Sequence, residues 1–252
     1  NLYAPINSTS NAGKKLFANN DGYITFDGGP LYTIQVIMES NNSKIRAPFY
    51  LGNGASNITL KNLIITDYTP LFVGQIPLIS YTANALREFN YQADNLISAG
   101  VYMRSIAPYD VKTGGNTYGI DTLVNKNNVI SGNYISGFGY GVVDLGIGIL
   151  KKPLSDYIIT FYNKNNTIEK NVMTNLGFAG VYMGFENNSK IERNRIDNVQ
   201  NTSLGTAAGI YLGGKLAKNY FGYHNTDISI NGNEISNIKS STERAIGVTT
   251  GA

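Results

Sequence analysis

Cysteine is absent from this chain, and histidine occurs once, at position 224. A disulfide framework is therefore excluded, and a zinc or copper site built from thiolate and imidazole ligands is not expected. With a single histidine, the sequence offers no basis for a serine or cysteine triad. The glycines are not followed by the Lys-Ser/Thr ending of a phosphate-binding loop. These absences remove several common enzyme classes from consideration.

Charge is also scarce, since 15% of the residues are charged against roughly 25% in an ordinary soluble domain. The net charge of +3 is small, and the Lys and Arg residues are dispersed, so we do not expect a nucleic-acid partner. No apolar run approaches the ~20 residues of a membrane span, and the first residues lack the basic and apolar regions of a signal peptide. We predict no membrane span and a mature or excised chain.

Amide, hydroxyl and glycine residues are abundant instead. The chain of 252 residues holds 28 Gly and 18 Tyr beside many Asn, Ser and Thr. Six Asn-x-Ser/Thr triplets are candidates for N-glycosylation: Asn7, Asn41, Asn57, Asn165, Asn187 and Asn201. Together with the low charge, they favour a secreted or cell-surface glycoprotein.

Four segments of the chain share one pattern, apolar-x-x-Asn-x-apolar. They read NVISGNYI (128–135), NTIEKNVM (166–173), SKIERNRI (189–196) and ISINGNEI (228–235). Aligning them places an Asn at one fixed turn position, namely Asn133, Asn171, Asn194 and Asn233. A Gly-aliphatic segment follows each of them: GYGVV, AGVYM, AGIYL and AIGVT. Such a repeat predicts a solenoid of stacked coils, in which the Asn column is structural.

The repeat defines the expected domain organisation. We predict one β-helix domain over residues 1–252, with the repeats sharpest over 127–252, looser repetition before them and an N-terminal lead-in over 1–20. A short helix is expected around Thr82 to Phe89. Two inserts, 146–165 and 213–224, are expected to be loops on one face, where repeat proteins often bind partners. They contribute four tyrosines as contact candidates: Tyr157, Tyr162, Tyr220 and Tyr223.

The segment NNTIEKNVMTNLGFAGVYMG, beginning at Asn165, resembles the right-handed parallel β-helix repeat proteins, which include carbohydrate-binding proteins and sugar hydrolases. This resemblance implies an all-β fold of three-faced coils with an aliphatic interior. It also implies surface chemistry directed most often at polysaccharide. It does not by itself imply catalysis, because one fold serves many functions.

A strip of outward side chains is the first candidate for glycan contact. Aligning the Gly-aliphatic strands places Asp121, Val143, Tyr182 and Tyr211 in one column, because alternate strand residues face one side. Tyr182 and Tyr211 are candidates for stacking on sugar rings. The alternative is that the aromatic rings stack on one another and stabilise the sheet.

Three residues are candidates for catalysis. His224 and Asp227 lie in His-Asn-Thr-Asp, which resembles the opening of the polygalacturonase pattern, although Ile228 replaces its Gly and its other signatures are missing. If Val142 faces inward, alternation sends Asp144 inward as well, where a carboxylate needs partners. We expect the strand to end at Val143 and Asp144 to open a turn. If Asp144 is instead buried with a raised pKa, it becomes the first candidate for a catalytic residue.

Paired charges recur in two successive coils, as Glu169-Lys170 and Glu192-Arg193. An exposed charge network is the preferred interpretation. Calcium between Glu169 and Glu192 is the alternative, although no further oxygen ligands occur at a recognisable spacing. We otherwise expect no metal and no cofactor.

These observations favour an extracellular structural or adhesion module, such as a surface layer, filament or adhesin component with a capacity to bind glycan. A polysaccharide lyase or glycoside hydrolase is one alternative, and a viral or phage spike segment is another. Residues 245–252, AIGVTTGA, show no cap for a solenoid end. We therefore expect self-association, or continuation of the chain, at that end.

Overall fold

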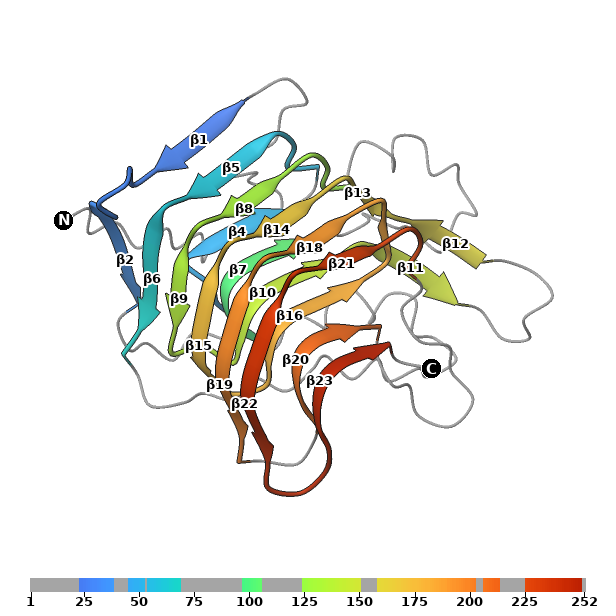
Figure 1. Ribbon diagram of the computed structural model, residues 1–252. Helices are drawn as coiled ribbons and strands as arrows, with labels where there is room; N and C mark the ends of the chain where they lie inside the picture. The colour runs from blue at the N-terminus through green and yellow to red at the C-terminus, as the bar shows by residue number, and fades with distance from the viewer. Residues whose placement is uncertain are drawn as a thin grey trace.

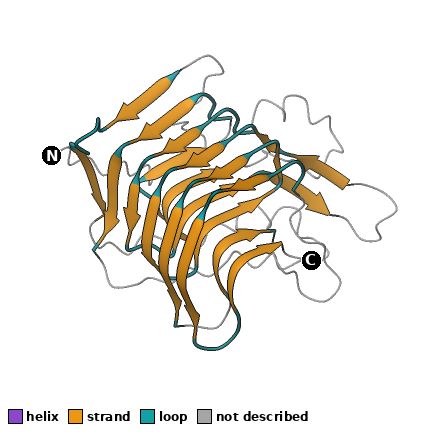
Figure 2. Ribbon diagram, in the orientation of Figure 1, coloured by secondary structure: helices purple, strands orange, loops and turns teal. Residues whose placement is uncertain are grey.

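The computed structural model describes residues 23–38, 45–52, 54–68, 97–105, 124–150, 158–202, 206–213 and 225–250. These residues form strands and the loops and turns between them, and none of them is helical (Figure 2). Most of the strands stack in parallel sheets (Figure 1). The predicted all-β class with stacked parallel strands is confirmed, and the helix predicted at Thr82 to Phe89 lies outside the described residues.

Three parallel sheets contain nearly all of the strands. Sheet I consists of β1 (Ile24–Asp27), β5 (Ile58–Lys61), β8 (Val129–Ser131), β14 (Thr167–Glu169), β18 (Lys190–Glu192) and β21 (Ser229–Asn231). Sheet II consists of β2 (Ile34–Met38), β6 (Leu63–Asp67), β9 (Tyr134–Ser136), β15 (Val172–Leu176), β19 (Arg195–Asn201) and β22 (Glu234–Ser240). Sheet III consists of β3 (Ile45–Arg46), β4 (Phe49–Gly52), β7 (Ile97–Arg104), β10 (Tyr140–Leu145), β16 (Ala179–Gly184), β20 (Ala207–Leu212) and β23 (Ala245–Thr250).

Two small sheets lie beside sheet III. β11 (Ile147–Leu150) and β12 (Ile158–Phe161) pair antiparallel, directly after β10 in the chain. β13 (Asn163–Lys164) and β17 (Glu186–Asn187) pair parallel at the corner that leads toward sheet I. The antiparallel pair falls inside the insert expected from the sequence at 146–165.

The chain passes through sheets I, II and III in turn, and each such pass is called a coil below. β14, β15 and β16 form one coil, and β18, β19 and β20 pair with them as the next. The register of sheet I aligns Ile130, Ile168, Ile191 and Ile230, the apolar column of the sequence repeat. The four repeats therefore stack one on another, an arrangement compatible with a parallel β-helix.

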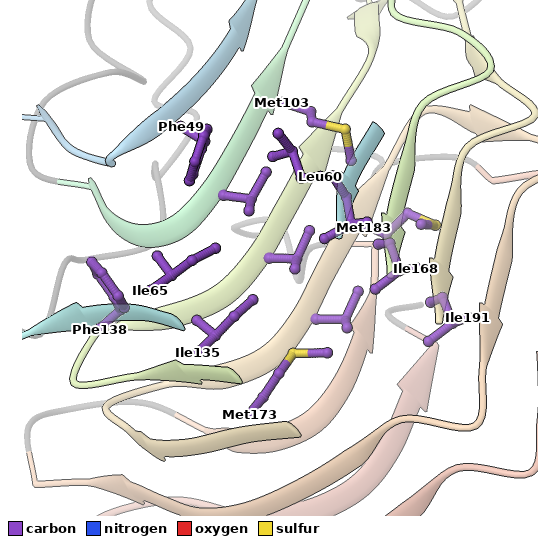
Figure 3. Packing of buried hydrophobic residues seen from close by; sticks show 14 of the residues in the cluster. Phe49, Leu60, Ile65, Met103, Ile135, Phe138, Ile168, Met173, Met183 and Ile191 are labelled. Atoms are coloured by element: carbon purple, nitrogen blue, oxygen red, sulfur yellow. The ribbon is translucent and has the colours of Figure 1, made fainter. Parts of the chain in front are cut away.

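Aliphatic side chains fill the space between the three sheets, as Figure 3 shows. Sheet I contributes Leu60, Ile130, Ile168 and Ile191, and sheet II contributes Ile65, Ile135, Met173 and Ile196. All of these side chains are buried. Burial of continuous columns of this kind supplies the main stabilisation of the fold.

The turns between the sheets depend on left-handed backbone. One corner column, Asn57, Asn127, Asn165, Asn188 and Asp227, has φ between 53° and 58°. Asn and Asp adopt this conformation at lower cost than other residues with a side chain. Part of the abundance of Asn in the sequence thus follows from these corners.

A column of glycines lines the start of the sheet III strands. A Cβ on Gly180 would lie 2.6 Å from Ile196 Cγ2, and a Cβ on Gly209 would lie 2.5 Å from Ile235 Cγ2. Glycine at these positions lets the sheet II aliphatics approach the sheet III backbone. This contact is the physical reason for the Gly-aliphatic segments of the repeat.

Candidate functional site

A buried pair of carboxyl groups is the least expected feature of the interior. Asp144 is fully buried on β10, between Met103 and Met183 in the register of sheet III. The strand does not end at Val143, so the expectation that Asp144 opens a turn is wrong. β10 continues to Leu145 because neighbouring amides satisfy the carboxylate where it lies.

The second carboxyl belongs to Glu186 on β17, which is also fully buried. Asn163 Nδ2 donates to Asp144 Oδ1 at 2.8 Å, and Asn166 Nδ2 donates to Asp144 Oδ2 at 3.1 Å. Ser189 Oγ donates to Glu186 Oε2 at 2.8 Å. The same Asn166 Nδ2 lies 3.4 Å from Glu186 Oε2, so that one amide spans the two carboxyls. Two carboxyls held this close and away from water disfavour ionisation of both at once.

Burial shifts both carboxyls toward the protonated form. It raises the pKa of Asp144 to about 6, although the interaction with Glu186 and the hydrogen bonds from Asn163 and Asn166 oppose the rise. The pKa of Glu186 lies well above its usual range because of burial and the nearby charge of Asp144. Carboxyl pairs with such values act as general acid and base in many enzymes, provided that substrate reaches them.

This pair differs from an active site because substrate cannot reach it in the folded chain. Both side chains are completely excluded from solvent, and the apolar interior lies on one side of them. Of the other candidates for catalysis, Asp227 is exposed at a coil corner, and His224 lies outside the described residues. The structure does not bring Asp227 into the buried pair.

An open depression on the outer face of sheet II is the second feature of interest. Its volume is about 710 Å³, and it spans coils from β2 to the end of β15. Its lining residues are Gln35, Ile64, Thr66, Asp67, Tyr68, Tyr134, Ser136, Gly137 and Asn175. Gly137 has φ of +87°, and a Cβ there would lie 2.0 Å from the carbonyl oxygen of Asp67. Gly137 thus lines the depression at a turn that leaves no room for a side chain.

Two tyrosines of the depression are accessible, since Tyr68 is 75% exposed and Tyr134 is 37% exposed. Asn175 Nδ2 donates to Ser136 Oγ at 3.2 Å, which places an amide and a hydroxyl on the same wall. Thr66 Oγ1 is buried in the wall and has no hydrogen-bond partner within the described part of the chain. Aromatic faces beside amide, hydroxyl and carboxylate groups are the side chains that recognise sugars, through stacking and hydrogen bonds.

The tyrosines predicted for glycan contact on sheet III are covered. Val143, Tyr182 and Tyr211 do share one column, as the alignment predicts. However, Tyr182 is 1% exposed and Tyr211 is 7% exposed. Their ring centroids lie 5.5 Å apart. The rings thus pack on one another, as the alternative interpretation describes.

The insert tyrosines are mostly beyond the described residues. Asp121, Tyr157, Tyr220 and Tyr223 lie outside them. Tyr162 is half-buried and packs against the aromatic cluster of sheet III.

Three of the glycosylation candidates lie at the corner between sheets III and I. Asn57, Asn165 and Asn187 are partly or fully exposed there, whereas Asn201 is buried, with 2% of its surface accessible. A glycan on Asn201 is incompatible with the folded chain, because its amide faces the protein. Asn7 and Asn41 lie outside the described residues.

The Asn column predicted from the repeat is a continuous hydrogen-bonded ladder. Asn133 Nδ2 donates to Asn171 Oδ1 at 3.0 Å, and the pairs Asn171–Asn194 and Asn194–Asn233 repeat the same bond at the same distance. Each Oδ1 also accepts the backbone N–H of the preceding Asn. These amides are mutually satisfied and offer nothing to a ligand.

The surface charges pair across coils. Arg193 Nη2 lies 2.6 Å from Glu169 Oε2 and 3.7 Å from Glu192 Oε2, so a cation occupies the place considered for calcium. Within the described ranges, no group of three or more His, Cys, Asp and Glu side chains is arranged to hold a metal ion. Nowhere in that part of the chain is there a helix with the length and hydropathy to cross a membrane.

Sequence reasoning missed Glu186, Tyr68 and Tyr134. The signal for Glu186 is present in the repeat, because aligning 163–166 (NKNN) with 186–189 (ENNS) places a Glu opposite an Asn. Tyr68 and Tyr134 carry no comparable signal, since neither belongs to a repeated aromatic column. Comparisons of the chain with protein-family models, curated proteins and solved structures give no match.

Proposed function

We propose that this chain is a right-handed parallel β-helix that serves as an extracellular structural or adhesion module and binds glycan chains in the depression on sheet II. The observation that supports the binding proposal is the pairing of two accessible tyrosines with polar side chains in one open depression. The strands of sheet II stack about 4.8 Å apart, so the depression extends along the coil axis. A polysaccharide chain lying across several coils fits that shape.

The binding proposal is tested by titrating the protein with a panel of soluble polysaccharides in a calorimeter. Tyr134→Ala is expected to weaken binding about tenfold, because a ring that stacks on a sugar is lost. Tyr23→Ala is the matched control, since Tyr23 is 85% exposed and is not part of the depression. Equal affinities for the two variants, or no binding to any polysaccharide, would reject the proposal.

The extracellular location is a separate part of the proposal, supported by the exposure of Asn57, Asn165 and Asn187. Intact mass spectrometry of the native protein before and after deglycosylation tests it. The mass is expected to fall on deglycosylation. An unmodified mass would remove the support that the sequons give.

Self-association, or continuation of the chain, at the last described coil is the structural part of the proposal. β21, β22 and β23 each pair on one side only among the described strands. The inward side chains of this coil are incompletely covered, and Val248 is 45% exposed. Strand edges and apolar side chains presented together favour association. A viral or phage spike is the variant of this proposal in which the assembly is a trimer along the coil axis.

The enzymatic alternative, a polysaccharide lyase or hydrolase, depends on Asp144 because of its burial and raised pKa. A hydrolase needs carboxyls on both sides of the scissile bond, and neither Asp144 nor Glu186 reaches solvent. The titrated polysaccharides can be analysed for shortened products in the same samples. Cleavage that is lost in Asp144→Asn would favour the enzyme over the binding module.

A further inference from the structure

The buried carboxyl pair interrupts two columns that are otherwise uniform. The inward column of sheet III contains Leu51, Met103, Met183 and Leu212, and Asp144 is its one carboxylate. At the adjacent corner Glu186 lies opposite Asn163 in the register. In the following coil the corresponding residue is again an asparagine, Asn225, whose Oδ1 accepts the backbone N–H of Glu186 at 3.0 Å. Two neighbouring coils thus each place an acidic residue at the same corner.

Glu186 does not accept a backbone N–H from the preceding coil, as the asparagines around it do. Asn163 Oδ1 accepts the backbone N–H of Asn125 at 2.9 Å, as in the other Asn columns. The corresponding N–H of Asn163 donates instead to the carbonyl of Phe185. Glu186 Oε1 has no partner among the described donors. The carboxyl is therefore available to Asp144.

Among the described residues, the groups around the pair are neutral. Asn166 Nδ2 lies 3.1 Å from Asp144 Oδ2 and 3.4 Å from Glu186 Oε2, so that it bridges the two carboxyls. The other contacts come from Asn163 and Ser189, and Met103 and Met183 are the neighbours on sheet III. Arg104 pairs in register with Leu145, so its side chain projects from the opposite face of sheet III. Lys164 follows Asn163 on β13 and therefore points to the opposite side.

The groups around the two carboxyls favour a bound proton over a bound metal ion. Among the described residues, the hydrogen bonds to Asp144 come from N–H donors, and those to Glu186 Oε2 come from an N–H and an O–H. Apart from the two carboxyls themselves, these contacts present hydrogens, whereas a cation needs further oxygen ligands. Two ionised carboxylates in contact inside a protein repel each other, and one of them keeps a proton instead.

We propose that Asp144 and Glu186 form a proton-operated lock between two coils: the corner between β10 and β17 is held closed while the pair keeps its proton, and loosens when the proton leaves. The corner lies where β11 and β12 branch from the coil, so loosening there changes the attachment of that insert. This inference does not depend on glycan binding, and its test does not use a glycan.

The direction of the pH dependence follows from the pKa shifts. Burial raises the pKa of both carboxyls above their ordinary values of 3.8 and 4.5, to about 6 for Asp144. The folded chain therefore binds more protons than the unfolded chain once the pH exceeds those ordinary values. The contribution of the pair to stability is complete in acid. It is lost progressively as the pH rises through 6, and the loss continues until Glu186 ionises.

Thermal unfolding of the full chain between pH 4.5 and 9 tests the lock, with Glu186→Gln and the double variant D144N/E186Q beside the wild type. Gln keeps a donor toward Asp144 without a titrating proton. The measured quantity is the Tm of Glu186→Gln minus the Tm of the wild type. We expect this difference to increase by about 5 °C between pH 5 and pH 8. The double variant is expected to lose this pH dependence altogether. Glu192→Gln, on the outward face of sheet I, is the control and should follow the wild type.

Parallel Tm profiles for the wild type and both variants would overturn the proposal. Infrared spectra at neutral pH provide a second measurement if a variant folds poorly. The wild type is expected to show the carbonyl band of a protonated carboxyl, and its absence would also overturn the proposal. If calcium raises the Tm of the wild type at pH 8 but not the Tm of Glu186→Gln, the pair binds a cation instead of a proton, and the proposal is overturned.

Discussion

At the residue scale, asparagine has two distinct uses in this chain. At exposed corners, such as Asn127 and Asn165, it supplies left-handed backbone. In the buried column, such as Asn171, its side chain bonds both neighbouring coils. The first use depends on conformation and the second on hydrogen bonding, so the two kinds of position respond differently to substitution.

Asn171→Ala is expected to lower the free energy of unfolding by about 3 kcal/mol, because it leaves buried groups on two coils without partners. Asn171 Nδ2 donates to the carbonyl of Ile130 at 2.8 Å, and Asn171 Oδ1 accepts from the backbone of Asn133 at 2.9 Å. Denaturant titration measures the change. Asn231→Ala is the control, since Asn231 is exposed on β21. A similar loss for both variants would contradict a special role for the ladder.

At the scale of the element, the strands of sheet III depend on a column of glycines, which have no Cβ. Gly100, Gly141, Gly180 and Gly209 each lie where a Cβ would meet a sheet II side chain at 2.3 to 2.6 Å. Gly247 occupies the equivalent place on β23, the last strand, where nothing lies within 4 Å of a Cβ. The chain thus contains its own internal comparison between a packed and an unpacked glycine.

Gly180→Ala is expected to destabilise the protein by about 1–3 kcal/mol through overpacking against Ile196 and the carbonyl of Gly209. Gly247→Ala is expected to be neutral or slightly stabilising, because the methyl group meets open space and the unfolded chain loses freedom. Thermal unfolding of the two variants is the measurement. Equal Tm values would show that close approach of the sheets does not determine this glycine column.

At the scale of the whole molecule, the coils differ in how well they are covered. The middle coils bury their inward residues completely, as at Ile168 and Ile191, whereas Ile230 and Ile235 of the last coil remain partly exposed. Ile24 and Phe26 of the first described coil are partly exposed as well. Stability in stacked repeats comes from contacts between neighbours, so the coils at the two ends of the described stack gain most from a further neighbour, whether a partner or more of the chain.

We expect the isolated chain to self-associate, and Val248→Lys to reduce that association, since a charge on an edge strand opposes pairing. Sedimentation at several concentrations measures both. Thr174→Lys adds the same charge on the outward face of sheet II, away from the edge, and should leave the association unchanged. A clean wild-type monomer at high micromolar concentration would count against assembly.

The sequence by itself determined the all-β class, the stacking of the repeats and the Asn column, because each depends on a pattern that recurs along the chain. Alignment of the repeats also placed Val143, Tyr182 and Tyr211 in their common column. It did not decide whether those rings are exposed, because burial depends on what covers the sheet. A repeat specifies register, and register alone does not give accessibility.

Only the tertiary structure decided the two features on which the proposals depend. Within the part of the chain that the structure describes, Asp144 is buried without a cationic partner, and Asn163, Asn166 and Glu186 reach it from the following corner and the next coil. The depression likewise combines Gln35, Tyr68 and Tyr134 from different coils. Stacking brings residues far apart in the chain to within a few ångströms of each other. A non-repeating group at one coil therefore meets partners that no local pattern indicates.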